Sequence, residues 1–208
     1  MDGQFLAPRP CAVQAGAAPA QARIIERMSI LKVARMGHPV LRTKTKPISL
    51  SEITSAPVQD LIDSMIATMQ EYHGAGLAAP QVHEGVRLFV ALVVPEQDED
   101  EDGEKKAPEP TVLALVNPEI SPVGRHTEED WEGCLSIPDL RGMVPRYDHV
   151  RVKAYDRTGK RVELEANGYM ARVLQHEYDH LDGVLFIDRM KSFQTLSFLD
   201  EYARYHQE

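Results

Sequence analysis

Two histidines four residues apart, in the segment Gln175 to His180 (QHEYDH), constrain this chain more than any other feature. Positions i and i+4 lie on one face of an α-helix, so a helix here would present both imidazoles to a single metal ion. Glu177 would point toward the same cavity, where it can take a proton from metal-bound water. The alternative is a pair of half-exposed histidines on a surface helix, and a third ligand has to decide between the two.

The third ligand could be a histidine, a glutamate or a cysteine. One large class of zinc proteases has a glycine and then a third histidine after the motif; here Gly183 is present, but Phe186 occupies the histidine position, so that class is excluded. Glu201 matches a two-His-one-Glu set only in its ligand type. Cys134 is the better candidate, because Gly133 beside it permits close backbone approach, although a lone cysteine is often only a small buried hydrophobe. Two histidines and one cysteine leave a fourth position open, as catalytic sites do.

A run of small residues from Gly74 to Gln81 (GAGLAAPQ) adds a third segment. Gly74 is expected to end the preceding helix. The small side chains that follow allow the backbone to pass close to a substrate or a metal. The side chain of Gln81 offers an N–H donor that could stabilise a developing oxyanion.

Together, the segments Gly74 to Gln81, Glu132 to Ser136 and Gln175 to His180 resemble the three signature motifs of peptide deformylases, in the same order. The similarity extends from about Ile30 to Asp188. It implies a metallohydrolase that removes the formyl group from formyl-methionine at the start of nascent polypeptides and releases formate. Metal-activated water would attack the formyl carbon.

The resemblance and the chemistry of the residues give each one a role. The predicted metal ligands are Cys134, His176 and His180. Glu177 would be the general base, and would later pass the proton to the leaving amine. The oxyanion would be held by the metal, the side-chain amide of Gln81 and the backbone N–H of Leu135.

The resemblance also implies a substrate site. The backbone of Ala75, Gly76 and Gly133 would pair with the peptide like an added strand. Arg141 would lie near its downstream end, and Val173 would line an apolar pocket for the methionine side chain. Many members of the family have Val or Ile in place of Ala75, so a wider pocket mouth is expected here.

One divalent metal ion per chain is expected. Thiolate and imidazole ligands suit zinc on general grounds. The resemblance instead implies iron(II) as the physiological ion, with nickel or cobalt as active substitutes and zinc as a weaker catalyst.

Two other functions compete with this interpretation. An endopeptidase would need a cleft open on both sides of the metal, which the small-residue segment argues against. A non-catalytic metal-binding or ribosome-associated adaptor would need neither Glu177 nor Gln81, and both are present.

The 208 residues fit one domain, residues 29–208, after a leader of residues 1–28 that is rich in Ala, Pro and Gln and is expected to be disordered. The leader lacks the apolar core of a secretory signal, and the longest apolar stretches are too short to span a bilayer. A cytoplasmic protein is expected, because a reducing compartment suits a thiolate ligand.

Much of the net charge of −9 lies in residues 95–110, where eight acidic residues accompany two lysines. This segment is expected to be a mobile, solvated hairpin loop. No basic stripe with interleaved aromatic residues occurs, so no direct nucleic-acid site is expected. From Arg189 onward the charges balance, which predicts at most a transient ribosome association through this tail.

The expected fold is α+β, with short antiparallel strands packed around a central helix that carries the His-Glu-x-x-His motif. The expected strands are residues 88–94, 111–117, 123–127, 150–155 and 161–165. The expected helices run from Ser55 to Gly74, from Asn167 to Asp182 and, at the C-terminus, from Phe193 to Tyr205.

Overall fold

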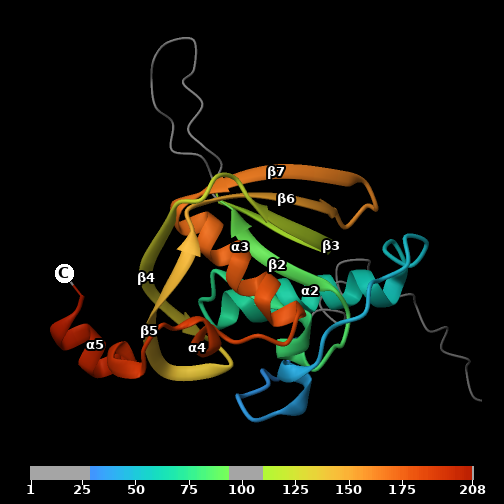
Figure 1. Ribbon diagram of the computed structural model, residues 1–208. Helices are drawn as coiled ribbons and strands as arrows, with labels where there is room; N and C mark the ends of the chain where they lie inside the picture. The colour runs from blue at the N-terminus through green and yellow to red at the C-terminus, as the bar shows by residue number, and fades with distance from the viewer. Residues whose placement is uncertain (1–28, 94–109, 208) are drawn as a thin grey trace, which may run out of the picture.

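The structure is a computed structural model that describes residues 29–93 and 110–207. The predicted leader and almost all of the predicted acidic loop lie outside these residues. Two antiparallel sheets surround one central helix, α3 (Gly168–Leu181), as Figure 1 shows. The predicted α+β class is confirmed. Among the described residues, none of the helices is long and apolar enough to cross a membrane.

The larger sheet has the strand order β1-β2-β3-β6-β7, and every neighbouring pair is antiparallel. Its strands are β1 (Gly76–Ala78), β2 (Leu88–Val93), β3 (Thr111–Pro122), β6 (His149–Tyr155) and β7 (Arg161–Asn167). The register pairs Leu88 with Val116, so the hairpin predicted across the acidic segment is confirmed. The second predicted hairpin, β6 with β7, is confirmed as well.

The smaller sheet has the order β4-β5-β8. Its strands are β4 (Thr127–Cys134), β5 (Ile137–Tyr147) and β8 (Ser197–Phe198). Within the described residues, β1 and β4 are therefore terminal strands of their sheets, each with one edge that no other strand covers. These two edges border the site described below.

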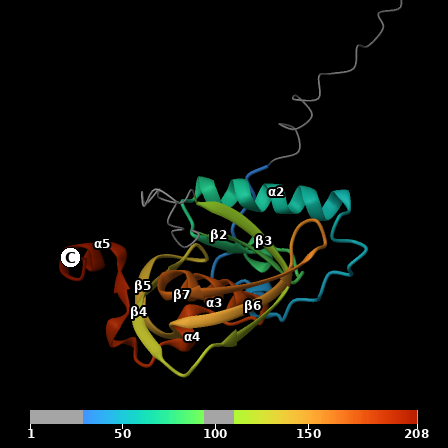
Figure 2. The ribbon, with the colours of Figure 1, turned by 90° about the horizontal axis from the view of Figure 1, so that it is seen from above.

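Two helices pack on opposite faces of the larger sheet (Figure 2). Successive side chains of a strand point to opposite faces. In β2, Leu88 and Val90 accordingly pack in a cluster with residues of α2 (Ala56–Glu71), whereas Phe89 and Ala91 pack in a cluster with residues of α3. Both helices were predicted, and the central position of α3 follows from this second cluster.

Short helices complete the described fold. They are η1 (Pro39–Arg42), η2 (Ala79–Val82), α4 (Phe186–Arg189), η3 (Phe193–Thr195) and α5 (Leu199–Tyr205). A third hydrophobic cluster joins α4 to β5 and to the segment before η1.

Several sequence-based expectations are corrected. The stretch predicted as one helix from Phe193 to Tyr205 is η3, β8 and α5 instead, because residues 197–198 pair with β5. Residues 123–126 form the turn between β3 and β4, with Gly124 at φ 86°, and not a strand. After α2 the left-handed residue is His73 (φ 52°), and Gly74 follows it.

Candidate active site

The predicted metal ligands come together at the centre of the molecule. Their ligand atoms, from Cys134, His176 and His180, all lie within 4.8 Å of one another. Cys134 is the last residue of β4, and its Sγ lies 3.2 Å from Nε2 of His180. His180 and His176 lie one helical turn apart on α3. All three are buried. A soft thiolate and two imidazoles at this spacing fit a single transition-metal ion.

Hydrogen bonds and charges around the cluster suit ligation. Nδ1 of His176 lies 2.9 Å from Oε2 of Glu132, which leaves Nε2 for a metal. Burial alone would raise the pKa of the Cys134 thiol, but the imidazoles of His180 and His176 bring this pKa well below its ordinary value. A lowered pKa favours the thiolate, which is the form that binds metals.

Glu132 belongs to a buried ionic network. It accepts hydrogen bonds from Nε of Arg146 at 2.8 Å and from Nη1 of Arg172 at 3.0 Å. Arg146 also donates to Asp179 on α3. Burial would raise the pKa of Glu132, but the bonds from His176 and Arg146 bring it to about 2. The network therefore keeps Glu132 as an anion that can hold the His176 ring in place.

Arg172 lies on α3, directly before Val173. Its side chain lines the cleft, but the residue is only 6% exposed. The guanidinium donates to Glu132 and to the backbone carbonyls of Glu128 and Val144. Its charge is therefore directed at protein acceptors, and it ties α3 to the smaller sheet.

Glu177 is 4% exposed and still reaches the cleft. Its Oε2 is buried and has no hydrogen-bond partner among the described residues. Burial raises its pKa to about 7 against the opposing effect of the two imidazoles. A buried, unpartnered carboxylate oxygen beside the ligand cluster is able to exchange a proton with a water or a substrate there.

The amide of Gln81 has a fixed orientation. Its Oε1 accepts from the backbone N–H of Ala78 at 2.8 Å, which identifies the oxygen. Nε2 is then directed toward Sγ of Cys134 at 3.5 Å and toward Oγ of Ser136 at 3.3 Å. The donor end of Gln81 thus lies beside the ligand cluster.

A cleft of about 750 Å³ lies over this cluster, between the Gly74–Gly76 backbone and β4. Ten of the eleven predicted site residues line it, namely Ala75, Gly76, Gln81, Gly133, Cys134, Leu135, Arg141, Val173, His176 and Glu177. His180 is fully buried behind them. The guanidinium of Arg141 lies across the Gly133 backbone, 1.9 Å from where a Cβ on Gly133 would be.

Gly76 leaves room for Glu177. A Cβ added at Gly76 would lie 2.5 Å from Oε1 and 2.6 Å from Cγ of Glu177. We therefore expect Gly76→Ala to displace the carboxylate and to lower turnover by at least tenfold, since small misplacements at a reacting centre are costly. Gly85→Ala is the control, because a Cβ there meets nothing within 4 Å. Equal kcat values for the two variants would show that Glu177 does not need this position.

Several residues that hold the site together had no function predicted from the sequence. Glu132 lies within the second motif, but its contact with His176 spans 44 residues of sequence. Ser136, in the same motif, is a hydrogen-bond partner of Gln81. The second motif draws attention to both residues, but a motif does not show which side chains they contact.

The fold and the site define a class of protein, the metal-dependent hydrolases in which a helix supplies two histidines and a glutamate. A comparison with family models then identifies the family. The chain belongs to the polypeptide deformylases, whose model matches residues 30–195. It is accordingly a hydrolase that acts on formylated nascent peptides.

Individual relatives agree with this assignment. A peptide deformylase of Salinibacter ruber is 49% identical over 166 residues, which cover 79% of this chain and 83% of the relative. Peptide deformylase 2 of a Nostoc species is 41% identical, over 83% and 93% of the two chains. A Met-Ala-Ser-bound class I type b peptide deformylase of Acinetobacter baumannii has a TM-score of 0.68 at 37% identity, covering 78% of this chain and 99% of that one.

Proposed function

We propose that this protein hydrolyses the formyl group of formyl-methionyl peptides with Glu177 as general base. The observation that carries the proposal is the position of Glu177 in the cleft beside Cys134, His176 and His180, with a buried carboxylate oxygen that has no partner in the described part of the chain. The membership of the chain in the deformylase family supplies the substrate class.

Cys134, His176 and His180 would hold one divalent metal ion. When bound, the ion would supply Lewis acidity toward water and the formyl carbonyl. We propose iron(II) as the ion used in the cell, because the resemblance to the family implies it. The thiolate–imidazole set also accepts nickel, cobalt and zinc, which are the alternatives.

The remaining steps belong to side chains of the protein. Glu177 accepts the proton of the attacking water and passes it to the nitrogen of the leaving methionine. The Gln81 amide and the Leu135 N–H, in the turn between β4 and β5, donate to the oxygen that becomes negatively charged. Ala78 already orients the Gln81 amide, and one of the two N–H groups that point toward Cys134 and Ser136 would turn to this oxygen.

The peptide would lie extended between the edges of β1 and β4. The carbonyl of Ala75 already accepts from Leu92. By the alternation of an antiparallel ladder, the N–H and C=O of Gly76 then face the open edge of β1. Gly76 and Gly133 are thus the backbone partners we propose for the peptide, with Ala75 beside them and Val173 in the wall of the methionine pocket.

We place the protein in the cytoplasm, where nascent formylated chains and a reducing environment coincide. A transient ribosome association through the tail is part of the same proposal. A cosedimentation assay with purified ribosomes at low and high salt would test it.

The test of the proposed function is formate release from formyl-Met-Ala-Ser, with acetyl-Met-Ala-Ser as the matched control peptide. Protein stripped of metal should be inactive, and one equivalent of iron(II), added without oxygen, should restore release. Parallel samples with nickel, cobalt and zinc, checked by elemental analysis, rank the ions. Cleavage of an internal peptide bond without formate release would support the endopeptidase alternative instead.

A further inference from the structure

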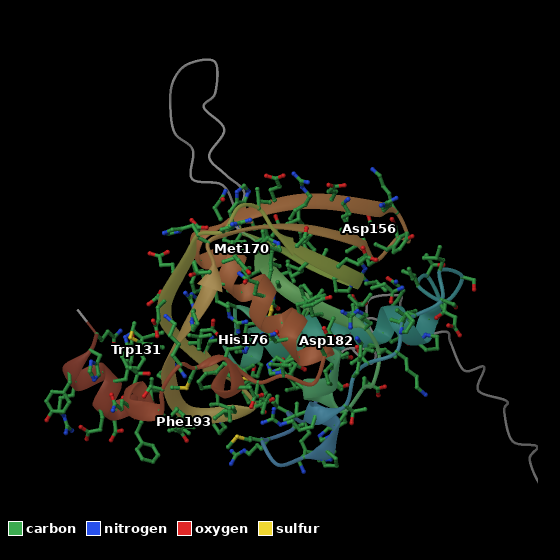
Figure 3. All side chains as sticks on the ribbon, in the orientation of Figure 1. Trp131, Asp156, Met170, His176, Asp182 and Phe193 are labelled. Carbon is green, nitrogen blue, oxygen red and sulfur yellow. The ribbon has the colours of Figure 1, made fainter. Side chains whose placement is uncertain are left out.

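The three predicted metal ligands belong to two elements that lie far apart in the sequence. His176 and His180 are on α3, whereas Cys134 is on β4. Figure 3 shows His176 on α3 in the interior of the molecule. The spacing of the three ligand atoms therefore depends on how α3 is held against β4. A side chain that bridges these two elements can set the shape of the ligand cluster.

Arg172 is a buried bridge of this kind. It lies on α3, one helical turn before His176 and on the same face of the helix. Its Nη1 donates to Oε1 of Glu132 at 3.0 Å, and Nδ1 of His176 lies 2.9 Å from the other oxygen, Oε2. Two side chains of α3, one turn apart, thus hold the two oxygens of a single carboxylate on β4.

The guanidinium of Arg172 is itself fixed to the smaller sheet. It donates to the backbone carbonyl of Glu128 on β4 at 2.9 Å and to that of Val144 on β5 at 2.7 Å. A guanidinium presents its donors in a rigid, planar fork, so these bonds set its orientation as well as its position. Arg172 can therefore keep Glu132 in one place, and Glu132 in turn fixes the ring of His176.

Arg146 also binds Glu132, but from a different direction. Its Nε lies 2.8 Å from Oε1 and its Nη2 lies 3.0 Å from Oε2. Arg146 is on β5, the neighbour of β4 in the same sheet, so these two bonds do not relate Glu132 to α3. Its own bond to α3 goes to another acceptor, Asp179. Among the described residues, Arg172 is thus the only side chain of α3, apart from the metal ligand itself, that binds Glu132.

We propose that Arg172 is a positioning residue of the metal centre, which acts through Glu132 to keep Nε2 of His176 directed at the ligand cluster. It would not bind the metal or the substrate. The inference rests on the proposed metal ligands, and it holds for whichever divalent ion they bind. Loss of the guanidinium should lower the affinity for metal by about tenfold, the lower end of the range for outer partners of a ligand.

The experiment measures the affinity for cobalt(II) by competition with a chelator of known affinity. The visible absorption bands of the cobalt(II) protein, which depend on the geometry of the ligands, are recorded as well. Arg172→Met keeps the aliphatic stem but removes the guanidinium, so it should bind cobalt about tenfold more weakly and show shifted bands. Arg189→Met is the matched control, because it removes a half-exposed guanidinium that binds Asp179 and not Glu132. It should bind cobalt as the unmodified protein does.

Arg172→Lys is a second variant, which keeps the positive charge if Arg172→Met does not fold. A single ammonium cannot reproduce the fork that reaches Glu132 and both carbonyls, so the affinity should fall here too. A double-mutant cycle then tests the route. Glu132→Gln should weaken cobalt binding by itself, and adding Arg172→Met should change it little further, because the two side chains act as a unit.

Three results would overturn the inference. The first is an Arg172→Met protein whose cobalt affinity and bands match those of the unmodified protein, even if its metal-free form melts at a lower temperature. The second is an equal loss of affinity from Arg172→Met with and without Glu132→Gln. The third is full affinity in Arg172→Lys. An unmodified protein that binds no cobalt would overturn the proposed metal site, and this inference with it.

Discussion

Glu177→Gln should lower kcat for formate release by about 10²–10⁴-fold, the usual contribution of a positioned general base. Glutamine matches glutamate in size, and Gly76 leaves room for it, so the fold and the ligand cluster should persist. The amide cannot accept the proton of the attacking water. The measurement is formate release at saturating substrate, together with metal content and melting temperature.

Glu84→Gln is the matched control for Glu177→Gln, because it removes one negative charge from an exposed residue. It should retain full turnover. A Glu177→Gln protein that carries a full equivalent of metal and still works at a near-normal rate would remove Glu177 from the role of base.

Cys134→Ala should lower the affinity for metal by more than the 10–100-fold typical of losing an outer partner of a ligand, since here a ligand itself is lost. The two histidines would remain on α3, but with no third protein ligand beside them among the described residues. Elemental analysis after dialysis and competition with a chelator of known affinity measure the change.

Cys11→Ala, which removes the other cysteine of the chain, should leave metal content unchanged. Cys134→Ser separates size from chemistry, because a hydroxyl does not ionise as a thiol does. One tightly held metal equivalent in the Cys134→Ala protein would contradict the assignment of Cys134 as a ligand.

The site could be predicted from the sequence to the extent that its chemistry is local. The i, i+4 spacing of His176 and His180 requires only a helix, and α3 forms as expected between Asn167 and Gly183. Gln81 and Cys134 were found because short motifs surround them. The positions of Gln81 and Cys134 relative to the two histidines depend on how the strands pair, and a local sequence pattern does not predict that pairing.

The parts that were missed depend on contacts distant in sequence. The strand β4 begins with the exposed residues Thr127 to Asp130, whose acidic side chains are typical of solvated segments and not of strands. Its pairing with β5 overrides that preference. The C-terminal helix was predicted too long because Phe193 to Tyr205 has a helical pattern, whereas the β8–β5 pairing interrupts it.

In the proposed binding mode, the two open strand edges limit when the reaction can take place. A peptide that lies along β1 and β4 must be extended over its first residues, and a chain whose N-terminus has already formed a helix or joined a sheet cannot adopt that shape. Deformylation therefore competes with the folding of the client protein. Clients whose first residues fold quickly should keep more of their formyl groups than clients whose N-termini stay unfolded.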